Sequence, residues 1–135
     1  RPGVTVFGTN YPTPDGTYIR DYIHVSDLSA AHLDALDHLR GGGEPDVFNC
    51  GYGHGFSVYE VIAAVKEVSG VDFPVALGKR RLGDPIALIA AADKIRAKLG
   101  WRPRFDDLET IVAHALAWER HLIESAAARV PLAGE

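Results

Sequence analysis

The chain of 135 residues contains no methionine and only one cysteine, Cys50. A lone thiol excludes a disulfide within the chain, and it favours a reducing, cytoplasmic setting. No apolar stretch approaches the roughly 18 residues that a transmembrane helix requires, so we expect no membrane association. Because the chain opens with Arg1 and lacks methionine throughout, we expect it to be part of a longer protein.

Positive charge is also scarce. The net charge is −4, and the basic residues cluster only at Lys79, Arg80 and Arg81. A nucleic-acid-binding domain usually carries a basic stripe or face, so we expect no nucleic acid as a partner. Hydrophobic residues make up 47% and charged residues 24%, which is typical of one folded domain of this length.

Residue patterns that carry catalysis are missing as well. No tyrosine is followed four residues later by lysine, no serine occupies a G-x-S-x-G turn, and the six histidines lack metal-ligand spacing. The glycines of residues 51–55 lack the G-x-G-x-x-G spacing, so we interpret this segment as a tight turn, beside which Asn49 is available to a ligand. We therefore predict no catalytic, cofactor-binding or metal-binding residue in this chain.

Strand and helix signals alternate along the chain, which predicts an α/β fold. The predicted strands are short and rich in β-branched residues, and they span residues 4–8, 47–50 and 73–77, with 18–25 extended. The predicted helices span residues 26–40, 57–69, 93–99 and 106–124. Three of them start at capping residues, namely Ser26, Ser57 and Asp106. From Ser125 onward the chain is rich in alanine, and we expect a frayed tail over residues 125–135.

Arg20 and Tyr22 form the first candidate site. If their segment is extended, the two side chains lie on one face. A guanidinium and a phenol on one face suit an anionic ligand that carries a ring. The pattern alone favours a simpler interpretation, in which Arg20 forms a surface ion pair with Asp21 or Asp15. His24, which follows on the same face, is expected to pack in the core.

The segment "KRRLGDP" (residues 79–85) forms the second candidate site. Arg81 precedes a Gly-Asp turn, and such a turn can direct the guanidinium toward a ligand while Asp84 accepts from a ligand hydroxyl. A solvated loop is the simpler alternative. If both sites bind the same ligand, Arg20 and Arg81 are suited to bracket a diphosphate.

Longer stretches carry a resemblance to a known family. The segments "VFGTNYPTPDGTYIRDYIHVSDLSAAHLDAL", "FNCGYGHGFSVYEVI", "RRLGDP" and "LGWRP" occur in this order. They resemble the C-terminal part of the UDP-glucose 4-epimerases, which belong to the extended short-chain dehydrogenase/reductase group. The resemblance implies that residues 1–124 form a UDP-sugar-binding C-terminal portion and that the N-terminal Rossmann half is missing. It also implies that residues 26–50 pack on that absent Rossmann layer.

The resemblance implies an activity for the full-length protein. Such an enzyme is an isomerase of galactose metabolism that holds NAD in its N-terminal half. It interconverts UDP-glucose and UDP-galactose through a 4-keto intermediate, and we expect it to form a homodimer. The present chain alone is expected to be inactive. The alternatives are an epimerase for another UDP-sugar, such as UDP-arabinose or a UDP-N-acetylhexosamine, and a non-catalytic nucleotide-sugar-binding fragment.

The resemblance also assigns the contacts with the UDP-sugar. Arg20 and Tyr22 match positions that contact the diphosphate. Arg81 and Asp84 match an R-x-G-D motif, in which the arginine faces the phosphates and the aspartate faces the ribose hydroxyls. The matched positions beside the uracil ring are Thr5 and Phe7.

Two positions depart from the family pattern. Leu88 stands where some members have a tyrosine that approaches the sugar nucleotide, so that contact is expected to be missing. Ala91 stands where the family usually has an aspartate that braces the following short helix. We expect Asp93 to take over the capping of that helix.

Overall fold

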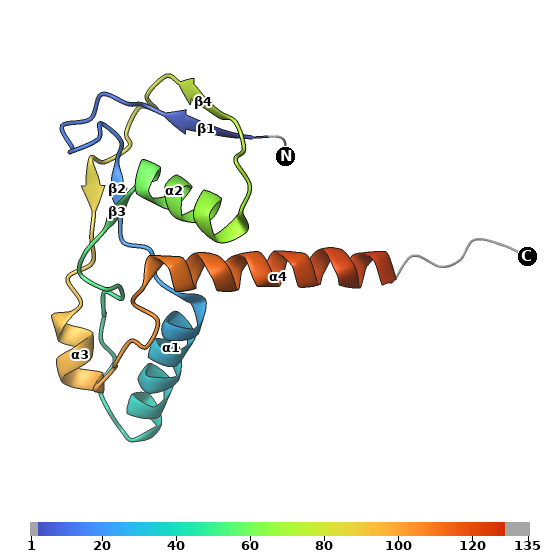
Figure 1. Ribbon diagram of the computed structural model, residues 1–135. Helices are drawn as coiled ribbons and strands as arrows, with labels where there is room; N and C mark the ends of the chain where they lie inside the picture. The colour runs from blue at the N-terminus through green and yellow to red at the C-terminus, as the bar shows by residue number, and fades with distance from the viewer. Residues whose placement is uncertain (1–2, 129–135) are drawn as a thin grey trace, which may run out of the picture.

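The structure, a computed structural model, describes residues 3–128 and is shown in Figure 1. Two small sheets lie on one side of a long helix, α4, and two further helices lie on its other side. In chain order the elements are β1 (Val4–Phe7), β2 (Ile19–Arg20), α1 (Val25–Arg40), β3 (Phe56–Ser57), α2 (Val58–Ser69), β4 (Val75–Gly78), β5 (Ala87–Leu88), α3 (Asp93–Leu99) and α4 (Leu108–Ala128). The alternation of strands and helices confirms the predicted α/β class.

The strands pair in two separate sheets. β1 and β4 run parallel, with Val4 opposite Val75 and Phe7 opposite Gly78. In the three-stranded sheet β2 is central, antiparallel to β3 and parallel to β5. Helix α2 packs against α4, whereas α1 packs against α3. Because β2 lies at the centre of its sheet, the segment that carries Arg20 and Tyr22 is fixed from both sides.

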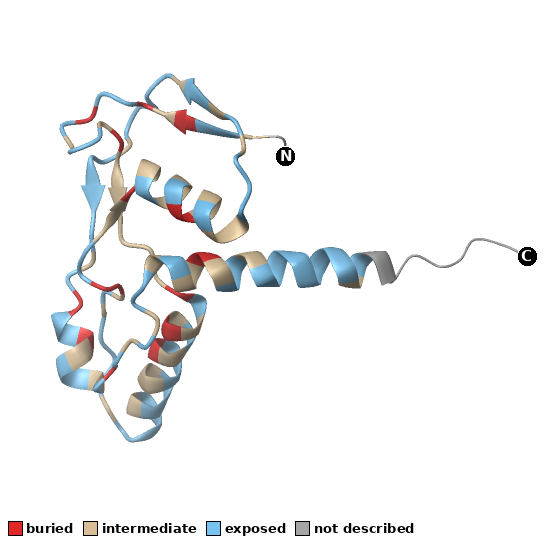
Figure 2. Ribbon diagram, in the orientation of Figure 1, coloured by how far each residue is buried: buried red, intermediate tan, exposed pale blue. Residues whose placement is uncertain are grey.

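The core lies between α1, α3 and the turn after residue 50 (Figure 2). Its largest member is Trp101, which is 1% exposed and whose indole Nε1 donates to the backbone oxygen of Asp27 at 3.0 Å. Tyr52, Ala31 and Ile95 pack around it. This cluster holds α1 against the segment that joins α3 to α4.

Two strand predictions need correction. Residues 47–50 form no strand, because a strand needs a neighbouring chain and no described residue pairs with this segment. The extended segment 18–25 contributes only the two residues of β2. Conversely, β5 was not predicted, because two residues give too short a pattern to recognise.

The helix starts differ from prediction in three places. Helix α1 is capped by His24, whose imidazole accepts from the backbone N–H of Ser26, so Ser26 is not the cap. Helix α3 follows Ala92 and has no side-chain cap, so Asp93 does not take over that role. At the start of α4 the carboxylate of Asp107 accepts from the N–H of Thr110 at 2.8 Å. The predicted cap, Asp106, instead accepts from His54.

Other predictions about the helices are confirmed. Ser57 and Glu60 form the complete capping box of α2. Gly70 and Gly100 end α2 and α3 in the left-handed conformation. Helix α4 continues through Ala128, so residues 125–128 are helical where a frayed tail was expected; the rest of that tail, 129–135, lies outside the described residues. Within residues 3–128 no helix combines the length and the hydropathy needed to span a bilayer.

Candidate functional site

A compact turn before β2 directs the strand toward the candidate site. Gly16 has φ +81°, and a Cβ there would lie 2.3 Å from the backbone oxygen of Thr9, so only glycine fits. Asp15 accepts from the N–H and the hydroxyl of Thr17, both at 2.8 Å. Thr17 is fully buried, and its Oγ1 accepts from the N–H of Val58 at 3.1 Å. The turn is therefore tied to the start of α2, which fixes the direction of β2.

Arg20 projects from β2 beside the segment that leads into β5. Its Nη1 donates to the backbone oxygens of Ile19 at 2.8 Å and Pro85 at 3.0 Å. Its guanidinium carbon lies 4.3 Å from the centre of the Tyr18 ring. Among the described residues Arg20 forms no ion pair, so the alternative of a surface pair with Asp21 or Asp15 is wrong.

Tyr22 is half-buried just beyond the end of β2. Burial raises the pKa of its phenol above the ordinary value, the neighbouring Tyr18 raises it further, and Arg20 only partly opposes this. The phenol is therefore neutral at physiological pH and can donate a hydrogen bond. His24, two residues later, is buried and stacks on Phe105, which confirms that it packs in the core.

Arg20 borders a cavity of ≈ 500 Å³. The cavity is also lined by Asp21, by residues 48–50 and by residues 88–90. Leu88 is 62% exposed in β5, so no bulky ring closes this part of the rim. The position of Ala91 is exposed just before α3.

Arg81 lies against β1 rather than beside Arg20. Its guanidinium carbon stands 4.0 Å from the centre of the Phe7 ring, and the preceding Arg80 stands 3.9 Å from the Tyr11 ring. Sequence reasoning missed Arg80, because its contact with Tyr11 joins residues far apart in the sequence. The two arginine–aromatic stacks fasten the loop of residues 79–84 to the start of the chain.

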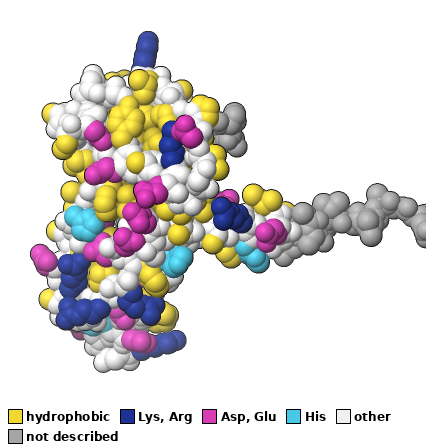
Figure 3. All heavy atoms as spheres, in the orientation of Figure 1, with side chains coloured by type: hydrophobic (Ala, Val, Ile, Leu, Met, Phe, Trp, Pro, Cys, Tyr) yellow, Lys and Arg dark blue, Asp and Glu magenta, His cyan; other side chains and the backbone are white. Residues whose placement is uncertain are grey.

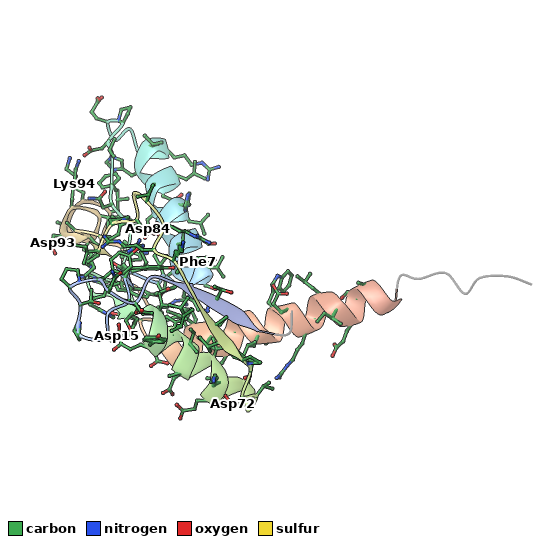
Figure 4. The ribbon with its side chains drawn as sticks, turned by 90° about the horizontal axis from the view of Figure 1, so that it is seen from above. Phe7, Asp15, Asp72, Asp84, Asp93 and Lys94 are labelled. Atoms are coloured by element: carbon green, nitrogen blue, oxygen red, sulfur yellow. The ribbon has the colours of Figure 1, made fainter. Side chains whose placement is uncertain are left out.

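Thr5, Phe7 and Arg81 share a second cavity of ≈ 840 Å³. Its other walls come from α2, from the segment before β4 and from Leu116 of α4. Asp84 lies partly exposed in the turn before β5. Figure 4 shows Phe7 and Asp84 as sticks on the segments that carry them.

Five of the six predicted contact residues therefore fall into two groups, and Asp84 lies in the segment that connects them. Arg20 lines the first cavity, with Tyr22 two residues further along the chain, whereas Thr5, Phe7 and Arg81 line the second. The segment 81–88 connects the groups, because it carries Arg81 at one end and holds Arg20 through the Pro85 oxygen at the other. Whether both arginines bind one diphosphate stays a prediction.

The glycine-rich segment after residue 50 is the tight turn that its spacing predicts. Gly53 has φ +88°. The N–H groups of Tyr52 and Gly53 both donate to the carboxylate of Asp21, at 3.0 Å each. These donors are occupied within the chain, so the turn does not fit the pyrophosphate of a dinucleotide. Asp21 is a second residue that sequence reasoning missed, because an aspartate after an arginine indicates only a surface pair.

Comparison with known proteins identifies close relatives. Residues 2–51 match the NAD dependent epimerase/dehydratase family. The chain is 57% identical over 125 residues to the UDP-glucose 4-epimerase of Azospirillum brasilense, which covers 93% of this chain and 36% of that protein. The chain thus spans little more than a third of the length of the curated relatives it matches.

Solved structures agree with this similarity. The UDP-Glc/GlcNAc 4-epimerase of Campylobacter jejuni is similar at a TM-score of 0.81 with 57% identity, over 90% of this chain and 36% of that one. The UDP-glucose-4-epimerase of Stenotrophomonas maltophila, solved with NAD and formylated UDP-arabinopyranose, is similar at a TM-score of 0.86 with 40% identity. That match covers 93% of this chain and 37% of the other.

Proposed function

Because the chain belongs to the UDP-glucose 4-epimerases of the extended short-chain dehydrogenase/reductase group, as their C-terminal part, we propose that it forms the UDP-sugar-binding part of an NAD-dependent epimerase. The full-length enzyme interconverts UDP-glucose and UDP-galactose through a 4-keto intermediate. The identity of 57% over nearly the whole chain carries this proposal. NAD is assigned to sequence outside the chain, since the turn after residue 50 does not fit it.

The chain's own residues bind and orient the nucleotide in this proposal. Nη1 of Arg20 is engaged by two backbone oxygens, which leaves Nη2 and Nε as the donors that we assign to a phosphate oxygen. The neutral phenol of Tyr22 donates to a second oxygen. Arg81 already stacks on Phe7, so its guanidinium lies where a phosphate joined to a ring beside Phe7 and Thr5 would need it. Asp84 is assigned to the ribose hydroxyls.

Residues 26–50 are proposed to pack on the Rossmann layer of the full-length enzyme. On α1, Leu33 is 62% exposed, and Val47 in the following segment is 81% exposed. Residues 47–50 also lack a strand neighbour among the described residues. Apolar surface next to an unpaired segment is what a domain shows where it packs on another part of the chain. A homodimer and a cytoplasmic location are proposed for the full-length enzyme on the resemblance and the single cysteine.

The preferred sugar is one of several related UDP-sugars. The relative from Campylobacter jejuni is named for both UDP-Glc and UDP-GlcNAc, and the one from Stenotrophomonas maltophila was solved with a formylated UDP-arabinopyranose. The exposed Leu88 leaves the rim of the first cavity without a ring. Rates with UDP-galactose, UDP-N-acetylgalactosamine and UDP-arabinose, measured on one enzyme preparation, rank the three.

The test is an epimerase assay on the protein expressed from its whole reading frame. Arg81→Ala is expected to raise the KM for UDP-galactose about 10–100-fold, because a charge-assisted contact to phosphate contributes about 1.5–3 kcal/mol. Arg102→Ala, which removes an exposed arginine after α3, is the matched control and should leave the KM unchanged. The 135-residue chain with added NAD should show no turnover. A full-length protein inactive on all three sugars overturns the proposal.

A further inference from the structure

Asp21 lies between the two β2-side residues assigned to the diphosphate and lines the first cavity, yet its carboxylate accepts from three backbone N–H groups of the chain itself. We propose that Asp21 is a positioning residue for the UDP-sugar, because it fixes the two segments that flank β2. This inference rests on the proposed function. Asp21 itself contacts no ligand in it; its effect passes through the segment 81–88 and the turn after residue 50.

The carboxylate of Asp21 joins three parts of the chain. Its Oδ1 accepts from the N–H of Tyr52 at 3.0 Å. Its Oδ2 accepts from the N–H of Gly53 at 3.0 Å and of Ala90 at 3.2 Å. Tyr52 and Gly53 precede β3 on one side of β2, and Ala90 follows β5 on the other side. A single carboxylate therefore holds both neighbours of the central strand.

The attachment of β5 depends on few other contacts. The strand has two residues, which pair with Ile19 and Arg20 of β2, and two further backbone bonds at the ends of this pairing run from the N–H of Ile19 to the oxygen of Ile86 and from the N–H of Asp21 to the oxygen of Leu88. A parallel pair this short is weak by itself. The bond from Ala90 to the carboxylate extends the pairing by one step. Without it, we expect β5 to separate from β2 more readily.

Separation of β5 from β2 would displace the residues that we assign to ligand contacts. The segment before β5 carries Arg81 and Asp84, and its Pro85 oxygen accepts from Arg20 at 3.0 Å. When β5 shifts, Pro85 moves away from the guanidinium, and Arg81 moves relative to Phe7. Both arginines thus lose their placement through one missing carboxylate.

The backbone beside Asp21 is built to admit its carboxylate. A Cβ on Gly51 would lie 2.5 Å from Oδ2 of Asp21 and 2.6 Å from the Cβ of Ala90. Glycine at this position is therefore required for the carboxylate to approach the turn. Asparagine cannot replace Asp21, because its NH₂ group donates where Oδ2 accepts from two N–H groups.

The probe is UDP, titrated calorimetrically into the full-length, NAD-loaded enzyme. Asp21→Asn is expected to weaken UDP binding about tenfold or more and to raise the KM for UDP-galactose by a similar factor, with kcat changed less than about threefold. The NAD content should match that of the wild type. Asp107→Asn is the matched control, since its carboxylate likewise accepts from a backbone N–H, that of Thr110 at the start of α4, and it lines neither of the two cavities.

A second variant covers the case in which Asp21→Asn does not fold. Gly51→Ala presses on the same carboxylate and should weaken UDP binding in the same direction. Unchanged UDP affinity in a folded Asp21→Asn or Gly51→Ala enzyme overturns the inference, as does an equal loss of affinity in Asp107→Asn. If the wild-type enzyme epimerises UDP-galactose and the folded variants keep its affinity for UDP, the inference alone is overturned. A wild-type enzyme that binds no UDP overturns the proposed function together with it.

Discussion

At the residue scale, Asp27 shows how a buried carboxylate organises this chain. It is fully buried in the first turn of α1. Its Oδ1 accepts from the N–H of Arg104 at 2.9 Å, and its Oδ2 accepts from the N–H of Phe105 and the hydroxyl of Tyr52, both at 2.8 Å. These bonds tie α1 to the segment before α4. Removing the carboxylate would leave the N–H groups of Arg104 and Phe105 without this acceptor, and the hydroxyl of Tyr52 with only the backbone oxygen of Phe105.

We predict that Asp27→Ala lowers the free energy of unfolding by about 3 kcal/mol. Burial favours the protonated acid, but the hydrogen bonds from Arg104, Phe105 and Tyr52 outweigh it and lower the pKa of Asp27 below its ordinary value. A carboxylate whose pKa falls on folding stabilises the protein above its unfolded pKa, and that stabilisation is lost as the pH falls toward the folded pKa.

The pH dependence of the free energy of unfolding tests this prediction. The free energy of unfolding in urea should fall more steeply between about pH 5 and pH 3 for the wild type than for Asp27→Asn, because the asparagine has no carboxylate to protonate. Asp72→Asn, at an exposed carboxylate paired with Lys66, is the control and should keep the wild-type slope. Parallel curves for the wild type and Asp27→Asn would contradict the prediction.

At the element scale, the start of α2 combines a capping box with a tertiary contact. The Oγ of Ser57 accepts from the N–H of Glu60 at 3.1 Å, and Oε2 of Glu60 accepts from the N–H of Ser57 at 2.6 Å. The same hydroxyl donates to the carboxylate of Asp15 in the turn before β2. The cap of α2 therefore also holds the turn that directs β2.

We expect Ser57→Ala to lower the free energy of unfolding by about 1–2 kcal/mol, since a lost N-cap alone costs about 1 kcal/mol and the contact with Asp15 adds to it. Glu60→Gln keeps an acceptor at the third helical position and should cost less than half of that. Thermal unfolding of both variants beside the wild type measures the difference. Equal losses in the two variants would show that the hydroxyl contributes nothing beyond the box.

Sequence patterns predicted the elements whose signals are local. The box of Ser57 and Glu60 and the glycine ends at Gly70 and Gly100 depend on residues within one or two turns, and all three are confirmed. The start of α1 was wrong, because an imidazole caps it and histidine is not among the usual capping residues. The predicted cap Asp106 is instead bound to His54, a contact 52 residues away that no local pattern reveals.

The candidate site shows the same contrast between local patterns, which the sequence reveals, and contacts between distant residues, which it does not. Arg20 and Tyr22 were paired because an extended segment would place them on one face, and the resemblance assigned them to the diphosphate; this assignment stays a prediction. Asp21 was missed, because its function depends on Tyr52, Gly53 and Ala90, which only the fold brings together. The sequence of residues 47–50 predicts a strand, but they form no strand among the described residues, because strand pairing depends on a neighbouring segment as well as on the segment itself.

At the scale of the whole molecule, the chain exposes more apolar side chains than a self-contained domain needs. Figure 3 shows hydrophobic side chains on the surface of the body and along α4. The exposed apolar residues of α1 include Leu33, Leu36 and Leu39, and the exposed Val47 follows in the next segment. Leu33 and Leu36 lie three residues apart and so share one face of the helix. A contiguous apolar face of this kind is stable only when something covers it.

This face leads to the last prediction. The 135-residue chain alone should associate as its concentration rises, because self-contact is the remaining way to cover α1 when the Rossmann layer is absent. The variant Leu33→Glu/Leu36→Glu should sediment as a 14.6 kDa monomer over the same concentration range. Trp118→Glu changes an equally exposed apolar residue on α4 and should leave the association as it is. In the full-length enzyme the same double substitution should reduce activity instead, because it places two charges where α1 meets the Rossmann layer. A wild-type chain that stays monomeric at every concentration, or a double variant with full activity in the full-length enzyme, would place the docking face elsewhere.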